Sequence, residues 1–244
     1  AAELEQFLVY AGRIWDAAAP HFVYGPAPSV SGVLRLGLRE VAKLTAIDPL
    51  RSMKRAVDAQ IKSPHLRRLL YRYATYNGSD PYRAPGTMAV ISHLEHNHGA
   101  FIMDKGMHQV VQSLVELGKE LGVDYHTNSP VEEILLEGSR ACGIRIGDKE
   151  HLFDRVITNM DVQPTYNKLL PSVKPPQKVL NQEKSTSALI FYWGIHGEHS
   201  DLDVHNILFS ADYQQEFDAL RNGRVSDDPT IYLYISKKHI PIDA

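Results

Sequence analysis

Residues 106–138 read GMHQVVQSLVELGKELGVDYHTNSPVEEILLEG, and the spacing of their apolar residues changes part-way along. In the first half, Val110, Leu114 and Leu117 recur at intervals of three and four, as on one face of an amphipathic helix. Gly122 then stands where a helix C-terminal cap is expected. The second half is rich in strand-forming residues, so we predict a helix over 106–122 that leads directly into β-structure.

Three or four short strands are expected after this helix. The runs that predict them are VDYHT (123–127), VEEILLEG (131–138), ACGIRIG (141–147) and HLFDRVITN (151–159). Short polar connections separate these runs, as in β-hairpins. The helix, the meander and a final strand ending in TNMD (158–161) indicate an α/β layer with an antiparallel insertion.

Residues 3–98 read as mainly helical, beginning with apolar residues at helical spacing from Leu4 to Trp15. Further helices are predicted at 33–44, 50–60, 64–76 and 85–97. Ser63 and Pro64 form a start signal for the third, because serine caps helices and proline suits their first turn. The stretches rich in turn residues, FVYGPAPSVSG (22–32) and YNGSDPYRAPG (76–86), are expected to be loops.

After residue 161, the sequence predicts a short helix at 162–171 and then a second sheet-based region. Its expected elements are strands at STSALIFYWGI (185–195), HNILFS (205–210) and TIYLYI (230–235), and a helix at DYQQEFDALR (212–221). The aromatic run Phe191-Tyr192-Trp193 is expected in the core of a sheet rather than in a ligand site.

The composition excludes several classes of function. The net charge is −3 and the basic residues are scattered, so a nucleic-acid partner is not expected. Cys142 is the single cysteine, which rules out an intrachain disulfide and a CxxC motif. No run approaches the roughly 20 apolar residues of a spanning helix, whereas peripheral membrane contact stays open.

A histidine-rich stretch, ISHLEHNHGAFIMDKGMH (91–108), raises the question of a metal site. It contains His93, Glu95, His96, His98 and His108. At about 100° per residue these side chains do not converge on one helical face, because Glu95 lies about 200° from His93. We therefore expect a solvated helix end and no bound metal.

Other catalytic motifs are absent from the sequence. It contains no HExxH, GxSxG or GxxxxGKS/T motif, and no two glycines are separated by one residue, so GxGxxG is missing. The adjacent carboxylates Glu132-Glu133 and Asp227-Asp228 are expected on the surface rather than as acid/base pairs. No side-chain acid or base can be assigned from the sequence.

Three segments together resemble the phytoene dehydrogenase family, which are FAD-dependent carotenoid desaturases related to the amine oxidases. They are RYATYNGSDPYRAPGTMAVISHLEHNHGAF, DKGMHQVVQSLVELGKELGVDYHTNSPVEEILLEGSRACGIRIG and DRVITNMDVQPTYNKLL. The likeness extends from about residue 60 to 172. It implies a mixed α+β or α/β fold with part of a Rossmann-like FAD-binding domain that carries a β-meander, beside helical and sheet parts of a substrate domain.

The resemblance also implies domains and cofactor contacts. Residues 1–98 would be a helical region facing substrate or membrane, 99–172 the centre of the FAD domain, and 173–244 a strand-rich part of the substrate domain. Val131 would lie against the FAD adenine through its backbone. The later contacts would come from the segment matching the family's VxxNAD-like sequence, which is Val156, Thr158, Asn159, Met160 and Asp161. The family's GGM is KGM here, with Lys105 in place of the first glycine. This replacement puts in doubt an unusually tight approach at that turn.

The implied activity is desaturation of phytoene or a related polyene by removal of a hydride and a proton, with FAD as the electron sink. The alternatives are a carotenoid isomerase of the same fold and a non-catalytic module that binds apolar ligands or docks on membranes. The expected location is cytoplasmic and peripheral to a membrane. Because GxGxxG is missing, we expect residues 1–244 to be an internal piece that alone is inactive and binds FAD weakly or not at all.

Overall fold

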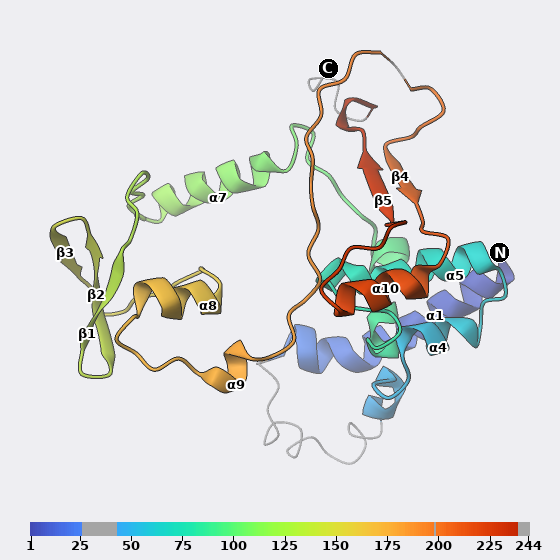
Figure 1. The fold of residues 1–244 in the computed structure, drawn as a ribbon, viewed down its shortest axis with the longest axis horizontal. Helices are drawn as coiled ribbons and strands as arrows, with labels where there is room; N and C mark the ends of the chain where they lie inside the picture. The colour runs from blue at the N-terminus through green and yellow to red at the C-terminus, as the bar shows by residue number, and fades with distance from the viewer. Residues whose placement is uncertain (26–42, 198, 239–244) are drawn as a thin grey trace. The chain divides into compact units, whose positions relative to one another are not determined.

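A computed structural model of the chain describes residues 1–25, 43–197 and 199–238. The chain divides into two compact units (Figure 1). Unit 1 comprises residues 1–109 and 185–244, and unit 2 comprises residues 110–184. Helices and small antiparallel sheets occur together, which confirms the predicted mixed helix-and-sheet class.

Unit 1 is mainly helical in its first half. Its helices are α1 (Ala2–Ala18), η1 (Ala19–Val23), η2 (Leu44–Ile47), α4 (Met53–Asp58), α5 (Pro64–Tyr71), η3 (Arg72–Asn77), η4 (Gly86–Ala89), α6 (Val90–His93), η5 (Leu94–His98), α10 (Tyr213–Arg221) and η7 (Ser236–Lys238). The helices predicted near 50–60, 64–76, 85–97 and 212–221 are thus confirmed. All but the end of the helix expected at 33–44 and most of the loop expected at 22–32 lie outside the described residues.

The core of unit 1 forms where α1 meets helices from both parts of the chain. Phe7 and Ile14 lie about two helical turns apart on the same face of α1 and are fully buried, together with Met53 of α4. Phe217 of α10 belongs to the same core, although more than 200 residues separate it from Phe7. The predicted cap is present, since the Ser63 side chain accepts a hydrogen bond from the backbone N–H of Leu66.

The second half of unit 1 contains a two-stranded sheet of β4 (His205–Leu208) and β5 (Ile231–Tyr234), which pair antiparallel. Strands were predicted at both places, whereas their pairing was not. A buried carboxylate joins this sheet to α10. The Glu216 Oε2 atom accepts hydrogen bonds from the hydroxyls of Ser210 (2.8 Å) and Thr230 (2.7 Å), and Oε1 accepts one from the Thr230 N–H (2.8 Å). Glu216 and Ser210 are both buried, so this cluster fixes α10 between the ends of the two strands.

The strand expected at 185–195 does not form. Among the described residues, no backbone hydrogen bond joins residues 187–195 to another segment, and Phe191, Tyr192 and Trp193 are exposed. The expectation that this aromatic run lies in the core of a sheet is therefore wrong for this structure. The physical reason is that an extended segment becomes a strand only when a neighbour satisfies its backbone groups.

The start of this segment is nevertheless held in place at Gly78, which follows η3. The Thr186 N–H donates a hydrogen bond of 2.8 Å to the Gly78 carbonyl oxygen. Gly78 adopts a left-handed conformation with φ of 69°, and a Cβ atom there would lie 2.6 Å from the Ser185 Cβ. Only glycine satisfies both demands, namely the positive φ and the close approach of another backbone.

Unit 2 contains a long helix, whose first two residues fall in unit 1, a meander and short helices. Its elements are α7 (His108–Glu120), β1 (Glu133–Glu137), β2 (Arg140–Ile146), β3 (Lys149–Leu152), α8 (Val162–Pro164), η6 (Thr165–Leu169) and α9 (Gln177–Leu180). The sheet order β1-β2-β3 is antiparallel throughout, with Ile134 opposite Ile144 and Gly143 opposite Leu152. The predicted helix with Gly122 at its C-terminal end, the meander and the short helix after residue 161 are confirmed.

Two expected strands of unit 2 are missing. Residues 123–127 form no strand, and the last strand ends at Leu152 rather than continuing to TNMD. Neither segment has a strand partner among the described residues.

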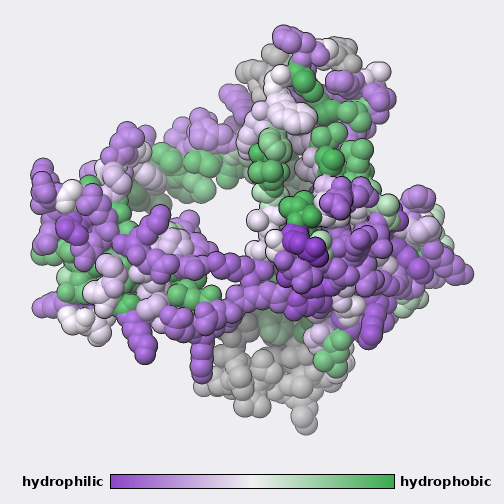
Figure 2. Space-filling model, viewed as in Figure 1, coloured by the Kyte–Doolittle hydropathy of each residue, from purple (hydrophilic) through white to green (hydrophobic). Residues whose placement is uncertain are grey.

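The apolar stripe of α7 is exposed, and Figure 2 shows apolar surface along this helix. The stripe consists of Val110, Val111, Leu114, Leu117 and Leu121.

Glu216→Ala should lower the free energy of unfolding by about 1–3 kcal/mol, because it leaves the buried hydroxyl of Ser210 and the half-buried donors of Thr230 without an acceptor. Thermal or urea unfolding measures the change. The matched control is Gln215→Ala, which alters the next and exposed residue of α10 and should change stability by less than about 0.5 kcal/mol. Equal free energies of unfolding for the two variants would show that the cluster does not contribute to stability.

Gly78→Ala should destabilise unit 1 more than Gly223→Ala does. Both glycines have φ of 69°, but the added methyl group at residue 223 meets nothing within 4 Å. The shared backbone cost is about 1–2 kcal/mol, and only Gly78→Ala adds a clash with Ser185. Unfolding midpoints of the two variants give the comparison, and coinciding midpoints would contradict a close approach at residue 78.

Candidate functional site

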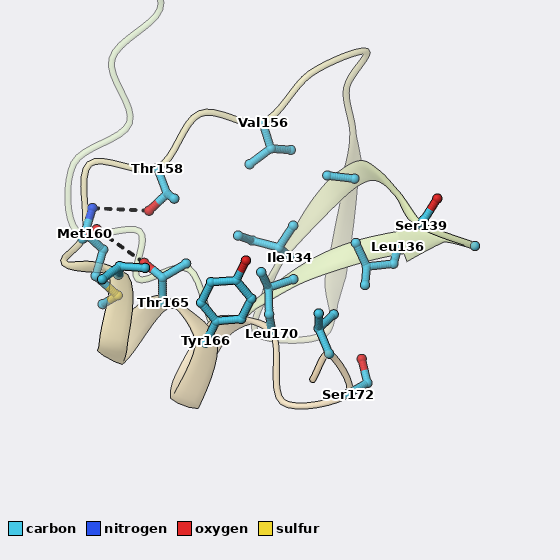
Figure 3. A pocket seen from close by; sticks show the side chains of 14 residues that line it. Ile134, Leu136, Ser139, Val156, Thr158, Met160, Thr165, Tyr166, Leu170 and Ser172 are labelled. Carbon is cyan, nitrogen blue, oxygen red and sulfur yellow. Dashed lines mark hydrogen bonds between the residues drawn. The ribbon is translucent and has the colours of Figure 1, made fainter. Parts of the chain in front are cut away.

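Unit 2 contains a pocket of about 940 Å³ between the meander and the segment that follows it. Figure 3 shows the side chains that line it, which come from β1, β2 and the turn between them, from residues 156–160, from α8, and from η6 with the turn after it. Most of them are apolar or small: Ile134, Leu136, Gly138, Ser139, Ala141, Val156, Thr158, Met160, Val162, Thr165, Tyr166, Leu170, Ser172 and Val173. Such a lining suits an apolar or planar group better than a charged one.

The structure places only some of the predicted cofactor residues at this pocket. Val156, Thr158 and Met160 line it. Asn159 and Asp161 are not among its lining residues, and Asp161 instead caps α8, where its Oδ1 atom accepts a hydrogen bond of 2.9 Å from the Gln163 N–H. Their contacts with a cofactor stay predictions.

Thr165 is a residue of the site that the sequence did not single out. Its hydroxyl lies 2.8 Å from the carbonyl oxygen of Asp161 and 3.3 Å from that of Met160, and its side chain is buried (Figure 3). The Thr158 hydroxyl accepts a hydrogen bond of 3.2 Å from the Met160 N–H. Two threonine hydroxyls therefore hold the turn at 158–161 in one conformation. The available signal was a threonine four residues after a capping aspartate, where back-bonding to the helix start is common.

Val131, predicted to contact a cofactor through its backbone, lies just before β1 and is not at the pocket. The ladder with β2 begins one residue later, where the Glu132 N–H donates to the Arg145 carbonyl oxygen (2.9 Å). No backbone hydrogen bond joins Val131 to another described residue. Its N–H and C=O are thus available to a ligand, as the prediction requires.

Lys105 does not strain the turn before α7. The positive φ of this turn belongs to Gly106, with φ of 79°, while Lys105 is exposed and has an ordinary φ. The Gly106 N–H closes the turn on the Met103 carbonyl oxygen (2.9 Å). The replacement of the family's first glycine by lysine is therefore compatible with the local backbone.

The histidine-rich stretch does not assemble around one point. Glu95 turns to two tyrosines, since its carboxylate oxygens accept hydrogen bonds from the hydroxyls of Tyr73 (2.8 Å) and Tyr76 (2.9 Å). Burial and then the bond to Glu95 raise the pKa of Tyr73 far above its usual range, so this hydroxyl stays a donor. The rings of His93 and His98 pack together with centroids 5.2 Å apart. Within the described part of the chain, no three His, Cys, Asp or Glu side chains are placed to hold a metal ion.

The adjacent carboxylates have structural partners rather than a shared proton. Glu133 forms an ion pair with Arg145 across β1 and β2. The Asp228 Oδ2 atom accepts a hydrogen bond of 2.7 Å from the Ala211 N–H. Glu133 and Asp228 thus each have a structural contact, and neither contact indicates a role in catalysis.

A family model described as "Flavin containing amine oxidoreductase" matches residues 33–189. This range is more than half of the chain and includes the pocket, Val131 and the turn at 158–161. The chain belongs to the flavin-containing amine oxidoreductase family. The matched range contains all the residues for which cofactor contacts were predicted.

The chain has relatives whose names refer to carotenoids. It is 45% identical over 186 residues to a 1-hydroxycarotenoid 3,4-desaturase of Flavobacterium sp., a match covering 76% of the chain and 38% of the relative. It is 34% identical to a 4,4'-diapolycopene oxygenase of Methylomonas sp. (82% and 41%) and 30% identical to a phytoene desaturase of Neurospora crassa (82% and 36%). The predicted membership of the carotenoid desaturase family is confirmed. The chain spans less than half the length of these relatives.

Thr165→Val should loosen the turn at 158–161, because it removes the hydroxyl that reaches two carbonyl oxygens while keeping the side-chain volume. We expect a loss of about 1 kcal/mol in unfolding free energy and a lower content of bound flavin in the full-length protein. Thr165→Ser, which keeps the hydroxyl, is the control and should retain the flavin. Equal flavin content in both variants, measured by absorbance after purification, would show that the hydroxyl does not position this turn.

Proposed function

We propose that the full-length protein is an FAD-dependent desaturase that introduces a double bond into a carotenoid-type polyene. The observation that carries this proposal is the 45% identity, over 186 residues, to a protein named 1-hydroxycarotenoid 3,4-desaturase. The family match is to flavin-containing enzymes, and FAD is the form of flavin proposed here. Residues 99–172 are proposed as the centre of a Rossmann-like FAD domain, and 1–98 with 173–244 as parts of a substrate domain.

The residues present fit such a cofactor at two places. The backbone groups of Val131 have no partner among the described residues, which suits an adenine edge that is held by backbone hydrogen bonds. At the second place, the turn at Thr158–Asp161 is held by Thr158 and Thr165 beside an apolar pocket. FAD, when bound, would accept the hydride that the substrate loses. This chain's own residues would orient the cofactor and exclude water from it.

The pyrophosphate of FAD is not accounted for by these residues. Dinucleotide-binding folds hold it at a glycine-rich turn that leads into a helix, and residues 1–244 contain no GxGxxG. Residues 1–244 alone are therefore proposed to bind FAD weakly or not at all. Tight flavin binding is proposed for the full-length protein, because the match covers only 36–41% of the length of the three relatives.

A second candidate is oxygenation of a polyene end group. It is favoured by the match to a protein named 4,4'-diapolycopene oxygenase, which is 34% identical over 204 residues. Desaturation removes two hydrogen atoms from the substrate, whereas oxygenation adds oxygen. The two reactions therefore differ in the mass of their product.

We also propose that the protein works in the cytoplasm at a membrane surface, where a water-insoluble polyene is available. Phe101 and Ile102 support this proposal, because both are exposed apolar residues on the link between η5 and α7. Among the described residues, no helix has the length and apolar character needed to cross a bilayer. Contact through exposed apolar residues is the form of association proposed here.

The proposed activity is tested by incubating full-length protein, FAD and liposomes that contain either phytoene or a 1-hydroxylated carotenoid. Products that lose two hydrogens and absorb at longer wavelength, in a reaction that requires FAD, are expected. A gain of oxygen would favour the second candidate, and a changed isomer composition at constant mass would favour an isomerase. Unchanged substrate in every arm, with flavin bound to the protein, would contradict the proposal.

A further inference from the structure

Residues 187–195 are apolar on both sides of an extended chain. Successive side chains of an extended segment point to opposite faces, so Ile190 and Tyr192 face away from Phe191 and Trp193. The rings of Phe191 and Trp193 pack with centroids 5.9 Å apart, as expected for neighbours on one face. All the large apolar residues of the segment are between 65% and 94% exposed: Leu189, Ile190, Phe191, Tyr192, Trp193 and Ile195.

The backbone of this segment is unpaired along both edges. In the described ranges, none of its N–H or C=O groups forms a backbone hydrogen bond with another segment. The nearest such bond precedes it, from the Thr186 N–H to the Gly78 carbonyl oxygen. Figure 1 shows the segment as part of the long trace between α9 and β4. Its start is thus fixed to unit 1, while the rest has the sequence of a strand and no neighbour.

A run that is apolar on both faces is typical of an interior strand with neighbours on both edges and layers on both faces. Strands that stay at a sheet edge are usually protected by lysine or another charged residue, or by proline. Residues 187–195, SALIFYWGI, contain no charged residue and no proline. The sequence is therefore suited to an interior position and lacks the protection that an edge needs.

Two occupants fail to meet these demands. A lipid bilayer could cover the apolar faces, but it offers no hydrogen bonds to the backbone groups. A second copy of the chain could pair with the segment about a two-fold axis. That pairing would use one edge of the strand and leave the other edge unpaired.

We propose that residues 187–195 are an interior strand of a sheet whose neighbouring strands come from the part of the full-length protein outside residues 1–244. The relatives are long enough to contain such strands, since the matched region covers only 38%, 41% and 36% of the three proteins compared above. The anchor at Gly78 and Thr186 sets where the strand enters this sheet. The proposal rests on exposure, pairing and length, and is independent of the reaction that the protein catalyses.

Hydrogen exchange of the full-length holoprotein tests the proposed strand. The amides of residues 189–193 should exchange at least about 100-fold more slowly than those of residues 199–201, as in an interior strand. Residues 199–201 are exposed, and their N–H groups form no hydrogen bond within the described part of the chain. Exchange at similar rates in the two segments would overturn the proposal. The measurement is repeated after tenfold dilution, and protection that falls on dilution would assign the neighbour to a second copy and equally overturn it.

Substitutions on the two faces give a second readout in the full-length protein. Ile190→Lys and Phe191→Lys each place a charge on one face, and both should lower the Tm by several degrees. The control is Val225→Lys, which changes a similarly exposed apolar residue outside regular structure and should leave the Tm within about one degree. Equal Tm values for all three variants would contradict burial of either face.

Discussion

Every backbone N–H and C=O group removed from water needs a hydrogen-bond partner, and this constraint governs which parts of the chain are complete. Helices satisfy it from within the segment, so α1, α4, α5 and α10 form and pack. The meander of unit 2 satisfies it with strands that follow one another directly. Residues 124–127, 154–159 and 187–195 form no backbone hydrogen bond with another described segment, and they form no strand.

Two carboxylates of unit 1, the buried Glu216 and the half-buried Glu95, join elements of the fold. Glu216 receives three hydrogen bonds from Ser210 and Thr230 and fixes α10 to the sheet of β4 and β5. Glu95 receives two from Tyr73 and Tyr76 and fixes η5 to η3. Both carboxylates therefore accept hydrogen bonds from hydroxyl or backbone N–H groups of other elements.

The sequence predicted what depends on local rules and missed what depends on distant partners. The start of α5 at Ser63-Pro64 and the end of α7 near Gly122 follow from capping chemistry, and both were found where expected. The aromatic run at 191–193 was expected in a sheet because of its composition, but composition does not say which segment lies beside it. Similarly, Val131 and Thr158 came from a family resemblance, whereas Thr165 became visible only when its hydroxyl was found against two carbonyl oxygens.

The order of the units along the chain has a consequence for how the protein is made. Unit 2 is inserted between the two parts of unit 1, and the core around Phe7 includes Phe217 of α10. On a ribosome, the first hundred residues therefore emerge with an open core that cannot close until the whole insertion and α10 have followed. Contacts this distant in sequence form slowly and leave apolar surface exposed in the meantime. Apolar surface of this helical region thus stays exposed on the nascent chain until α10 has been synthesised.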